Sequence, residues 1–279
     1  LDMCRSWPVP LMNAWWPAYQ RLALEGKQRG CKVILTGGGG DEWLTTSTIL
    51  AADLIRTLNV VGFYRLWDST RRSYGGSGLA TLRGLLWTFG FRPMVHAAAH
   101  SIVPGLVRRR QRRRMAESMP DWVAPDAALR RELAERVEER AERDEPTPEP
   151  GNRGFYTRDL RRYLDHAIPA MLTDEAFEAG RRIEMRVLRP FWDADLVDLL
   201  CRTPPHLLYK DGLSKGLVRQ SLARRFPDLG FERQKKVWAT NFFGARMVQE
   251  GGRALQELGG TPALAELGVV DPKIVNSGM

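Results

Sequence analysis

A run of four glycines followed by two acidic residues is the part of the sequence best suited to chemistry. It reads Thr36-Gly-Gly-Gly-Gly-Asp41-Glu42 and follows a short apolar segment. Consecutive glycines let backbone N–H groups approach an anion closely, and a helix that starts just after them adds its positive end. A carboxylate just beyond them can hold the Mg²⁺ that accompanies a polyphosphate. Gly37, Gly39, Gly40 and Asp41 are therefore candidates for binding phosphate, with Asp41 as the candidate metal ligand.

Two familiar phosphate-binding motifs do not fit this run. It lacks the Lys-Ser/Thr pair of a P-loop, and Glu42 stands where a dinucleotide-binding fingerprint has its third glycine. A simpler alternative is a tight turn in which Asp41 or Glu42 stabilises the start of the next helix. The residues of the run alone leave both interpretations open.

The elements on either side of the glycine run are typical of α/β proteins. The pattern predicts a helix over Trp15–Gln28 with Gly30 as its stop, and a strand over Lys32–Thr36. A second helix is predicted from Trp43 to about Leu58, because apolar residues recur there at helical spacing. Helix, strand, glycine turn and helix in this order indicate an α/β fold.

Helical patterns dominate the remainder of the chain. We expect helices joined by a loop from Tyr74 to Gly90, a break at Arg92-Pro93, and a charged helix over Asp126–Arg143. The stretch 144–151 carries three prolines and a glycine, so it cannot continue that helix. We expect the charged helices and this proline-rich loop, at about 104–152, to form an insertion.

Composition describes a folded chain of ordinary character. With 279 residues, 43% of them hydrophobic and 27% charged, the chain is long enough to bury a core and is not collagen-like or wholly disordered. Its three cysteines are widely spaced, which gives neither a disulfide framework nor a zinc site, and a reducing cytoplasm fits best. No apolar run reaches the roughly 18 residues that a membrane span needs. We expect neither a membrane segment nor an export signal.

The net charge of +9 attracts polyanions in general, and an ATP-type substrate satisfies it as well as nucleic acid or anionic lipid does. Six arginines fall between Arg108 and Arg114, a cluster that could neutralise phosphates. No recognised nucleic-acid-binding motif accompanies it, and the acidic segment 132–149 could pair with it. We expect a solvated face there rather than nucleic-acid binding. The four histidines lack metal partners, and Trp15, Trp16, Trp67 and Trp87 are expected to pack in the core.

Four segments, in this order, resemble the asparagine synthetase-like family. Residues 31–44 resemble its strand followed by S/T-G-x-G-x-D-E, and Arg189-Pro-Phe-Trp-Asp193 resembles its P-F-x-D segment. Residues 210–219 resemble its G-x-x-K-x-x-L-R helix, and residues 233–238 its R-x-K-x-x-F loop. The similarity runs in patches from about residue 8 to residue 241.

This resemblance implies a fold and a reaction. The fold is a parallel α/β nucleotide-binding core of the PP-loop ATP pyrophosphatase type, wrapped by helices. In the reaction, ATP adenylates a carboxylate, pyrophosphate leaves, and an amine displaces AMP to give an amide. ATP and Mg²⁺ are then required, together with a carboxylate substrate and an amine donor that is ammonia, an internal amine or a peptide amine. Asparagine synthetases, β-lactam synthetases and lasso-peptide cyclases share this step.

The resemblance also implies roles for two lysines. Lys235 would stabilise charge on the α-phosphate and the departing pyrophosphate, with a solvated lysine beside Lys236 as the alternative. Lys215 would lie on an amphipathic helix and either point to phosphate or cover a polar face. Asp193 is expected to be structural, capping a helix that begins near Ala194.

Two departures from the family pattern stand out. The pyrophosphate-binding S-G-G-x-D-S motif is absent and should lie N-terminal to Leu1, and the amidotransferase domain with its N-terminal Cys nucleophile is absent too. We therefore expect the C-terminal part of a synthetase domain, inactive alone. Gly38 stands where asparagine synthetases usually carry Glu, near the incoming nucleophile or acyl group. The alternatives are a non-catalytic binding or scaffold protein that keeps the fold, or a basic nucleic-acid-binding helical module.

Overall fold

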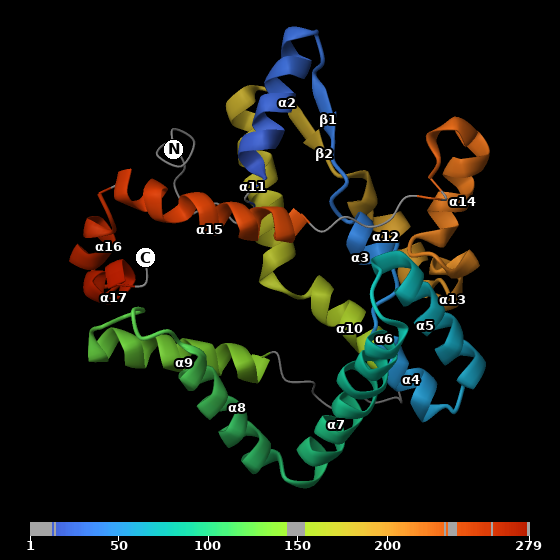
Figure 1. Cartoon of the computed structure of the whole chain (residues 1–279), viewed down its shortest axis with the longest axis horizontal. Coiled ribbons are helices and arrows are strands. Elements are labelled where there is room, and N and C mark those ends of the chain that lie inside the picture. Colours follow the sequence, from blue (N-terminus) through green and yellow to red (C-terminus); the bar gives the residue numbers. More distant parts are fainter. Residues whose placement is uncertain are drawn as a thin grey trace. The chain divides into compact units, whose positions relative to one another are not determined.

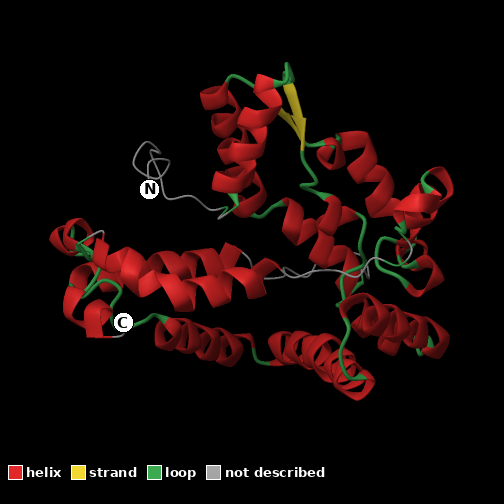
Figure 2. Ribbon diagram, turned by 45° about the horizontal axis from the view of Figure 1, so that its top comes forward, coloured by secondary structure: helices red, strands yellow, loops and turns green. Residues whose placement is uncertain are grey.

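The computed structural model describes residues 13, 15–143, 154–231, 233, 239–257 and 259–277. The chain divides into two compact units, one of Leu1–Phe91 with Gly151–Lys235 and another of Arg92–Pro150 with Lys236–Met279. Helices dominate both units, as the red ribbons of Figure 2 show. None of the described helices combines the length and the apolar character that crossing a bilayer requires.

A two-stranded parallel sheet organises the first unit. Strand β1 (Val33–Leu35) pairs with β2 (Arg186–Leu188), with Ile34 opposite Val187. Helices α2 (Trp16–Gln28) and α11 (Ala167–Ile183) lie beside these strands (Figure 1). The predicted helix and strand before the glycine run are therefore confirmed, each within a residue or so of its expected bounds.

The helix predicted from Trp43 to Leu58 is wrong as one element. The structure has a short α3 (Gly40–Trp43) and a separate α4 (Leu50–Arg56). Four of the six residues between them, Thr45 to Thr48, are Thr or Ser, whose hydroxyls compete with helical hydrogen bonding. Thr46 Oγ1 donates to the Pro205 carbonyl at 3.1 Å, and Ser47 Oγ donates to Asp159 at 2.7 Å. These contacts to later parts of the chain replace the helical path.

Further helical segments complete the first unit and enclose two apolar clusters. One cluster joins Leu50, Leu66, Leu85 and Tyr209, while the other, described with the site, centres on Trp43. These segments are α5 (Val60–Tyr74), α6 (Gly78–Arg83), the π-helix η1 (Gly84–Phe91), α10 (Phe155–Leu164), η2 (Pro190–Trp192), α12 (Ala194–Arg202), α13 (Pro205–Leu208), η3 (Lys210–Gly212), α14 (Gly216–Arg225) and η4 (Pro227–Leu229).

Helices also make up the second unit: α7 (Arg92–Ile102), α8 (Pro104–Ser118), α9 (Ala127–Arg143), α15 (Ala239–Glu257), α16 (Pro262–Glu266) and α17 (Pro272–Ser277). The break expected at Arg92-Pro93 is wrong, because helical residues continue without a gap from α6 through η1 into α7, and only the type of helix changes at Arg92. The charged helix predicted to end at Arg143 is confirmed as α9. Residues 144–150 of the proline-rich loop lie outside the described residues, and an insertion at 104–152 stays a prediction.

The tryptophans predicted to pack in the core do not all do so. Trp16 is buried at 7% exposure, and Trp67 packs against the Leu50 cluster. Trp87 is 60% exposed, so the prediction is wrong for this residue. It lies in η1, where the wider π-helical turn changes which side chains share a face relative to the α-helical spacing used to place it.

Candidate functional site

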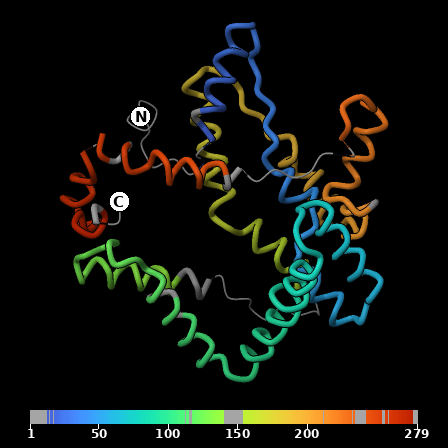
Figure 3. Tube along the Cα trace, in the orientation of Figure 1, coloured from blue at the N-terminus to red at the C-terminus, as the bar shows by residue number. Residues whose placement is uncertain are grey.

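The glycine run and the segment 189–193 lie side by side because the two strands before them are parallel. Residues 36–40 leave β1 where residues 189–193 leave β2, at the same edge of the sheet (Figure 3). The Thr36 N–H donates to the Leu188 carbonyl at 2.9 Å and carries the pairing one step beyond the strands. Two motifs about 150 residues apart in sequence thus form one site.

Gly39 is the glycine of the run that the fold itself requires. Its φ is +93°, and a Cβ built on it would lie 2.9 Å from the Phe191 Cβ and carbonyl oxygen and from the Trp192 ring. Gly37 differs, because nothing lies within 4 Å of its built Cβ and its φ is not in the left-handed region. The space beside Gly37 is therefore open to a ligand, whereas that beside Gly39 is filled by protein.

Trp43 holds α3 in place at the end of the glycine run. It is 2% exposed and meets the Trp192 ring edge-on at 5.2 Å and the Tyr163 ring edge-on at 5.7 Å between centroids. Around these rings pack Leu44, Val197, Leu200 and Leu208, which are all buried. Asp193, the predicted cap, accepts a hydrogen bond from the Leu196 N–H at 3.1 Å and starts α12 beneath this cluster, as expected.

Asp41 and Lys215, which were predicted as site residues from separate motifs, lie together in the structure. Lys215 Nζ lies 2.7 Å from Asp41 Oδ1 and 3.7 Å from a Cβ built on Gly40. Both side chains remain partly exposed, 33% for Lys215 and 57% for Asp41, so a ligand can reach them. Lys215 does not lie within a helix as expected. It stands at the N-cap of α14, and its φ of +60° is the strained left-handed conformation for a non-glycine residue.

Glu42 has a structural partner. Its Oε1 accepts a hydrogen bond from the Tyr163 hydroxyl at 3.1 Å, and burial together with Glu42 raises the pKa of Tyr163 above its ordinary range. Neither Asp41 nor Glu42 is the N-cap of α3, since that residue is Gly39. Both acids lie in the first turn of α3, where negative charge complements the helix dipole. Tyr163 carried no signal in the sequence, because its partner lies 121 residues away.

A cavity of about 830 Å³ opens beside the glycine run, within the first unit. Helices α2 and α11 and the strands supply a largely apolar wall, and Gly37, Gly38, Asp41, Glu42 and Arg189 lie along its rim. Arg189 was quoted in a motif but given no role by the sequence. Its Nη1 donates to Thr173 Oγ1 at 2.5 Å, and its guanidinium lies 5.7 Å from the Trp192 ring centroid.

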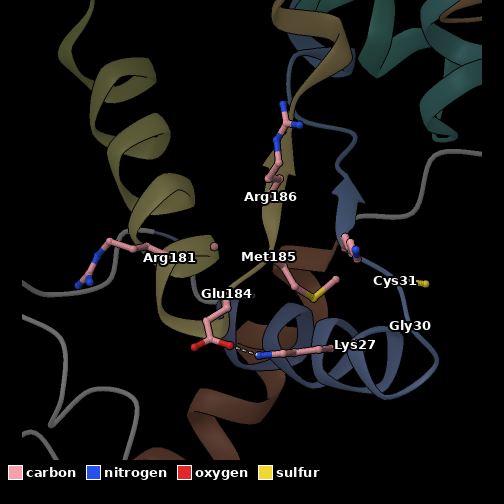
Figure 4. A pocket seen from close by; sticks show the side chains of 9 residues that line it. Lys27, Gly30, Cys31, Arg181, Glu184, Met185 and Arg186 are labelled. Carbon is pink, nitrogen blue, oxygen red and sulfur yellow. Dashed lines mark hydrogen bonds and ion pairs between the residues drawn. The ribbon is translucent and has the colours of Figure 1, made fainter.

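A second, shallower hollow of about 620 Å³ lies at the opposite edge of the sheet, where both strands begin (Figure 4). Lys27 Nζ pairs with Glu184 Oε2 there at 2.7 Å, which lowers the pKa of Glu184, and Cys31 is a free thiol. Because the glycine run leaves the sheet at the other edge, this hollow is not part of the same site.

Two of the expected site features are not placed by the described residues. Lys235, with its neighbours Lys236 and Trp238, lies outside them, so its role stays a prediction. The described residues also contain no group of three His, Cys, Asp or Glu that could hold a metal. Mg²⁺ bound with a polyphosphate commonly uses only one or two protein carboxylates, and Asp41 fits that pattern.

Comparison with known proteins gives one match. The family model described as asparagine synthase matches residues 3–279. No curated protein and no solved structure matches the chain.

Proposed function

Because the chain belongs to the asparagine synthase family, we propose that it forms an amide by adenylating a carboxylate with ATP and releasing pyrophosphate. The observation that carries this proposal is the ion pair between Asp41 Oδ1 and Lys215 Nζ, 2.7 Å apart. It joins the glycine run to the loop before α14, so an anion-accepting backbone, a carboxylate and an ammonium group meet in one place. That combination suits a metal-bound polyphosphate.

Each residue of the site has a separate proposed role in binding Mg-ATP. The backbone beside Gly37 is open to phosphate oxygens, and Gly39 and Gly40 let the loop pack closely on Phe191. Asp41 would hold Mg²⁺, which neutralises charge on the phosphates when bound. Lys215 lies where it can exchange its pairing with Asp41 for a phosphate oxygen. Lys235 is proposed to stabilise the charge that develops on the α-phosphate and pyrophosphate.

The proposed reaction has two displacements. A carboxylate oxygen of the substrate attacks the α-phosphorus of ATP, and the bond from this phosphorus to pyrophosphate breaks. The nitrogen of the amine donor then attacks the activated carbonyl carbon, loses a proton, and AMP leaves with the former carboxylate oxygen. Ammonia, an internal amine and a peptide amine all satisfy this balance.

The exposed strands support a proposed larger core of the PP-loop ATP pyrophosphatase type. Parallel sheets are normally covered on both faces, yet Leu35 is 68% exposed, Val33 40% and Leu188 38%. We propose that further strands, with the pyrophosphate-binding S-G-G-x-D-S motif, complete this sheet in the working enzyme. The free thiols Cys31 and Cys201 agree with a reducing compartment, for which we propose the cytoplasm.

Replacing Asp41 with Asn tests this function. Asp41→Asn removes one formal charge with little change in volume, and its half-exposed ion pair contributes at most about 1 kcal/mol to stability. We expect the full-length variant to lose Mg-ATP-dependent exchange of radiolabelled pyrophosphate into ATP, measured with a panel of carboxylic acids, while its circular dichroism is unchanged.

Asp193→Asn is the matched control for Asp41→Asn. Asn caps a helix about as well as Asp, so this variant loses the same charge nearby without losing the cap. We expect its exchange rate to match that of the wild type. Undiminished exchange in Asp41→Asn would remove Asp41 from the site.

A further inference from the structure

The bare backbone of Gly38 leaves a small space bounded by two polar side chains. A Cβ built on Gly38 would lie 3.2 Å from Arg189 Nε, 3.3 Å from Arg189 Nη2 and 3.6 Å from Thr36 Oγ1. The arginine follows β2 and the threonine ends the pairing of β1, so the parallel strands bring both groups to this point. Two hydrogen-bond donors therefore converge where residue 38 has no side chain.

Arg189 is a half-buried cation that has no close ion pair with a carboxylate among the described residues. In the part of the chain that the structure describes, no carboxylate lies within 4.0 Å of its guanidinium; Thr173 and the Trp192 ring are its contacts. Burial lowers the pKa of Arg189, although the charges of Glu42 and Tyr163 act in the opposite direction. The nearby Glu42 is held by Tyr163 instead. A guanidinium in this state gains most from an anion that accepts two hydrogen bonds.

Thr36 supplies a second, independent observation. Its Oγ1 is buried and has no hydrogen-bond partner among the described residues. Buried hydroxyls are normally satisfied, so an orphan beside this guanidinium indicates a missing acceptor. An oxygen atom of a ligand bound beside Gly38 would lie near this hydroxyl and could accept its hydrogen bond.

The cavity beside this space indicates that the rest of the ligand is apolar. Most of its wall is apolar, from α2, α11 and the strands. The other arginine of its wall, Arg182, is paired with Glu178 at 2.7 Å. A ligand that fills the cavity therefore has an apolar body, and its negative charge is matched at one end only, by Arg189.

We propose that Arg189, with Gly38 and Thr36, binds the carboxylate of an acid whose apolar body occupies this cavity. This inference rests on the proposed function, since it names the class of acid that the same site takes. The phosphates belong beside Asp41 and Lys215, at the part of the cavity where Asp41 lies. Arg189 is thus a substrate-binding and specificity-determining residue.

Direct binding of apolar acids to the full-length protein, without ATP, tests the proposal. The probes are octanoate and hydrocinnamate, their neutral amides, inorganic phosphate and pyrophosphate, measured by calorimetry. We expect each acid to bind at least about tenfold more tightly than its amide. Arg189→Met should weaken binding of the acids by about ten- to a hundredfold, the usual effect of losing a charge-assisted hydrogen bond, and leave the amides unchanged.

Two further variants keep the test decisive. Arg182→Met removes the same charge from the same cavity away from Gly38, and we expect it to bind the acids as the wild type does. Gly38→Asp places a carboxylate against Arg189, so it should abolish acid binding, while circular dichroism checks that the variant is folded. If Arg189→Met does not fold, Gly38→Asp still tests whether the acids bind at Arg189.

Distinct results would overturn the proposal. These are absent acid binding in the wild type, equal binding in Arg189→Met, or a loss of affinity confined to phosphate and pyrophosphate, which would assign Arg189 to the nucleotide. Arg189-dependent acid binding in a protein that exchanges no pyrophosphate would instead refute the proposed function and leave the acid site standing.

Discussion

Substituting Gly39 with Ala should break the packing that joins the glycine run to the segment after β2. The change forces a non-glycine residue to φ +93°, and its Cβ would lie 2.9 Å from Phe191 and from Trp192. A left-handed backbone costs about 1–2 kcal/mol for such a residue, and overpacking adds about 1–3 kcal/mol. The expected loss of unfolding free energy is therefore about 2–5 kcal/mol, a large share of a typical domain's stability.

Urea unfolding followed by tryptophan fluorescence measures this loss, because Trp43 and Trp192 lie at the loop. Gly37→Ala is the matched control, since nothing lies within 4 Å of its built Cβ. It should change stability by no more than about 1 kcal/mol, in the stabilising direction if at all. It should still weaken Mg-ATP binding, because the methyl group occupies the space open to phosphate. Equal midpoints for the two variants would refute the packing argument.

Three further predictions concern other residues. Lys235→Ala should lower kcat and kcat/KM together by about 10² to 10³ with ATP affinity nearly unchanged, whereas Lys236→Ala should not; equal mild effects in steady-state kinetics would indicate general surface charge. Hydrogen bonds from Arg181 and Arg182 lower the pKa of Glu178 from 4.5 to about 2, so its stabilisation is present above pH 4.5 and fades as the pH falls toward 2. The melting temperatures of wild type and Glu178→Gln should therefore differ at neutral pH and converge near pH 2; parallel curves would contradict this. Trp43→Ala should cost about 3–5 kcal/mol in urea unfolding, and a near-neutral result would show that α3 is held in another way.

Local sequence patterns were enough to predict the helix and strand before the glycine run and the helix after Asp193. Apolar spacing located α2 and β1, and the Pro190-Phe191 segment before Asp193 correctly indicated a capped helix. The family motifs also nominated Asp41 and Lys215, which the structure places in contact. These successes depend on short-range signals, such as capping and periodicity, that a sequence displays directly.

Other features depend on contacts between distant segments, which a single sequence does not display. Thr46 and Ser47 interrupt the predicted helix by bonding to residues more than 100 positions away. The pairing of Tyr163 with Glu42 and the approach of Arg189 to Gly38 follow from the parallel pairing of the strands.

Following a labelled oxygen atom tests most directly that the chain activates a carboxylate by adenylation. The full-length protein would be supplied with Mg-ATP, an amine, and a carboxylic acid labelled with heavy oxygen, and the products would be examined by mass spectrometry and phosphorus NMR. Adenylation predicts one labelled oxygen in AMP, together with pyrophosphate and amide in equal amounts. Label in inorganic phosphate accompanied by ADP, or amide formed with unlabelled AMP, would contradict it.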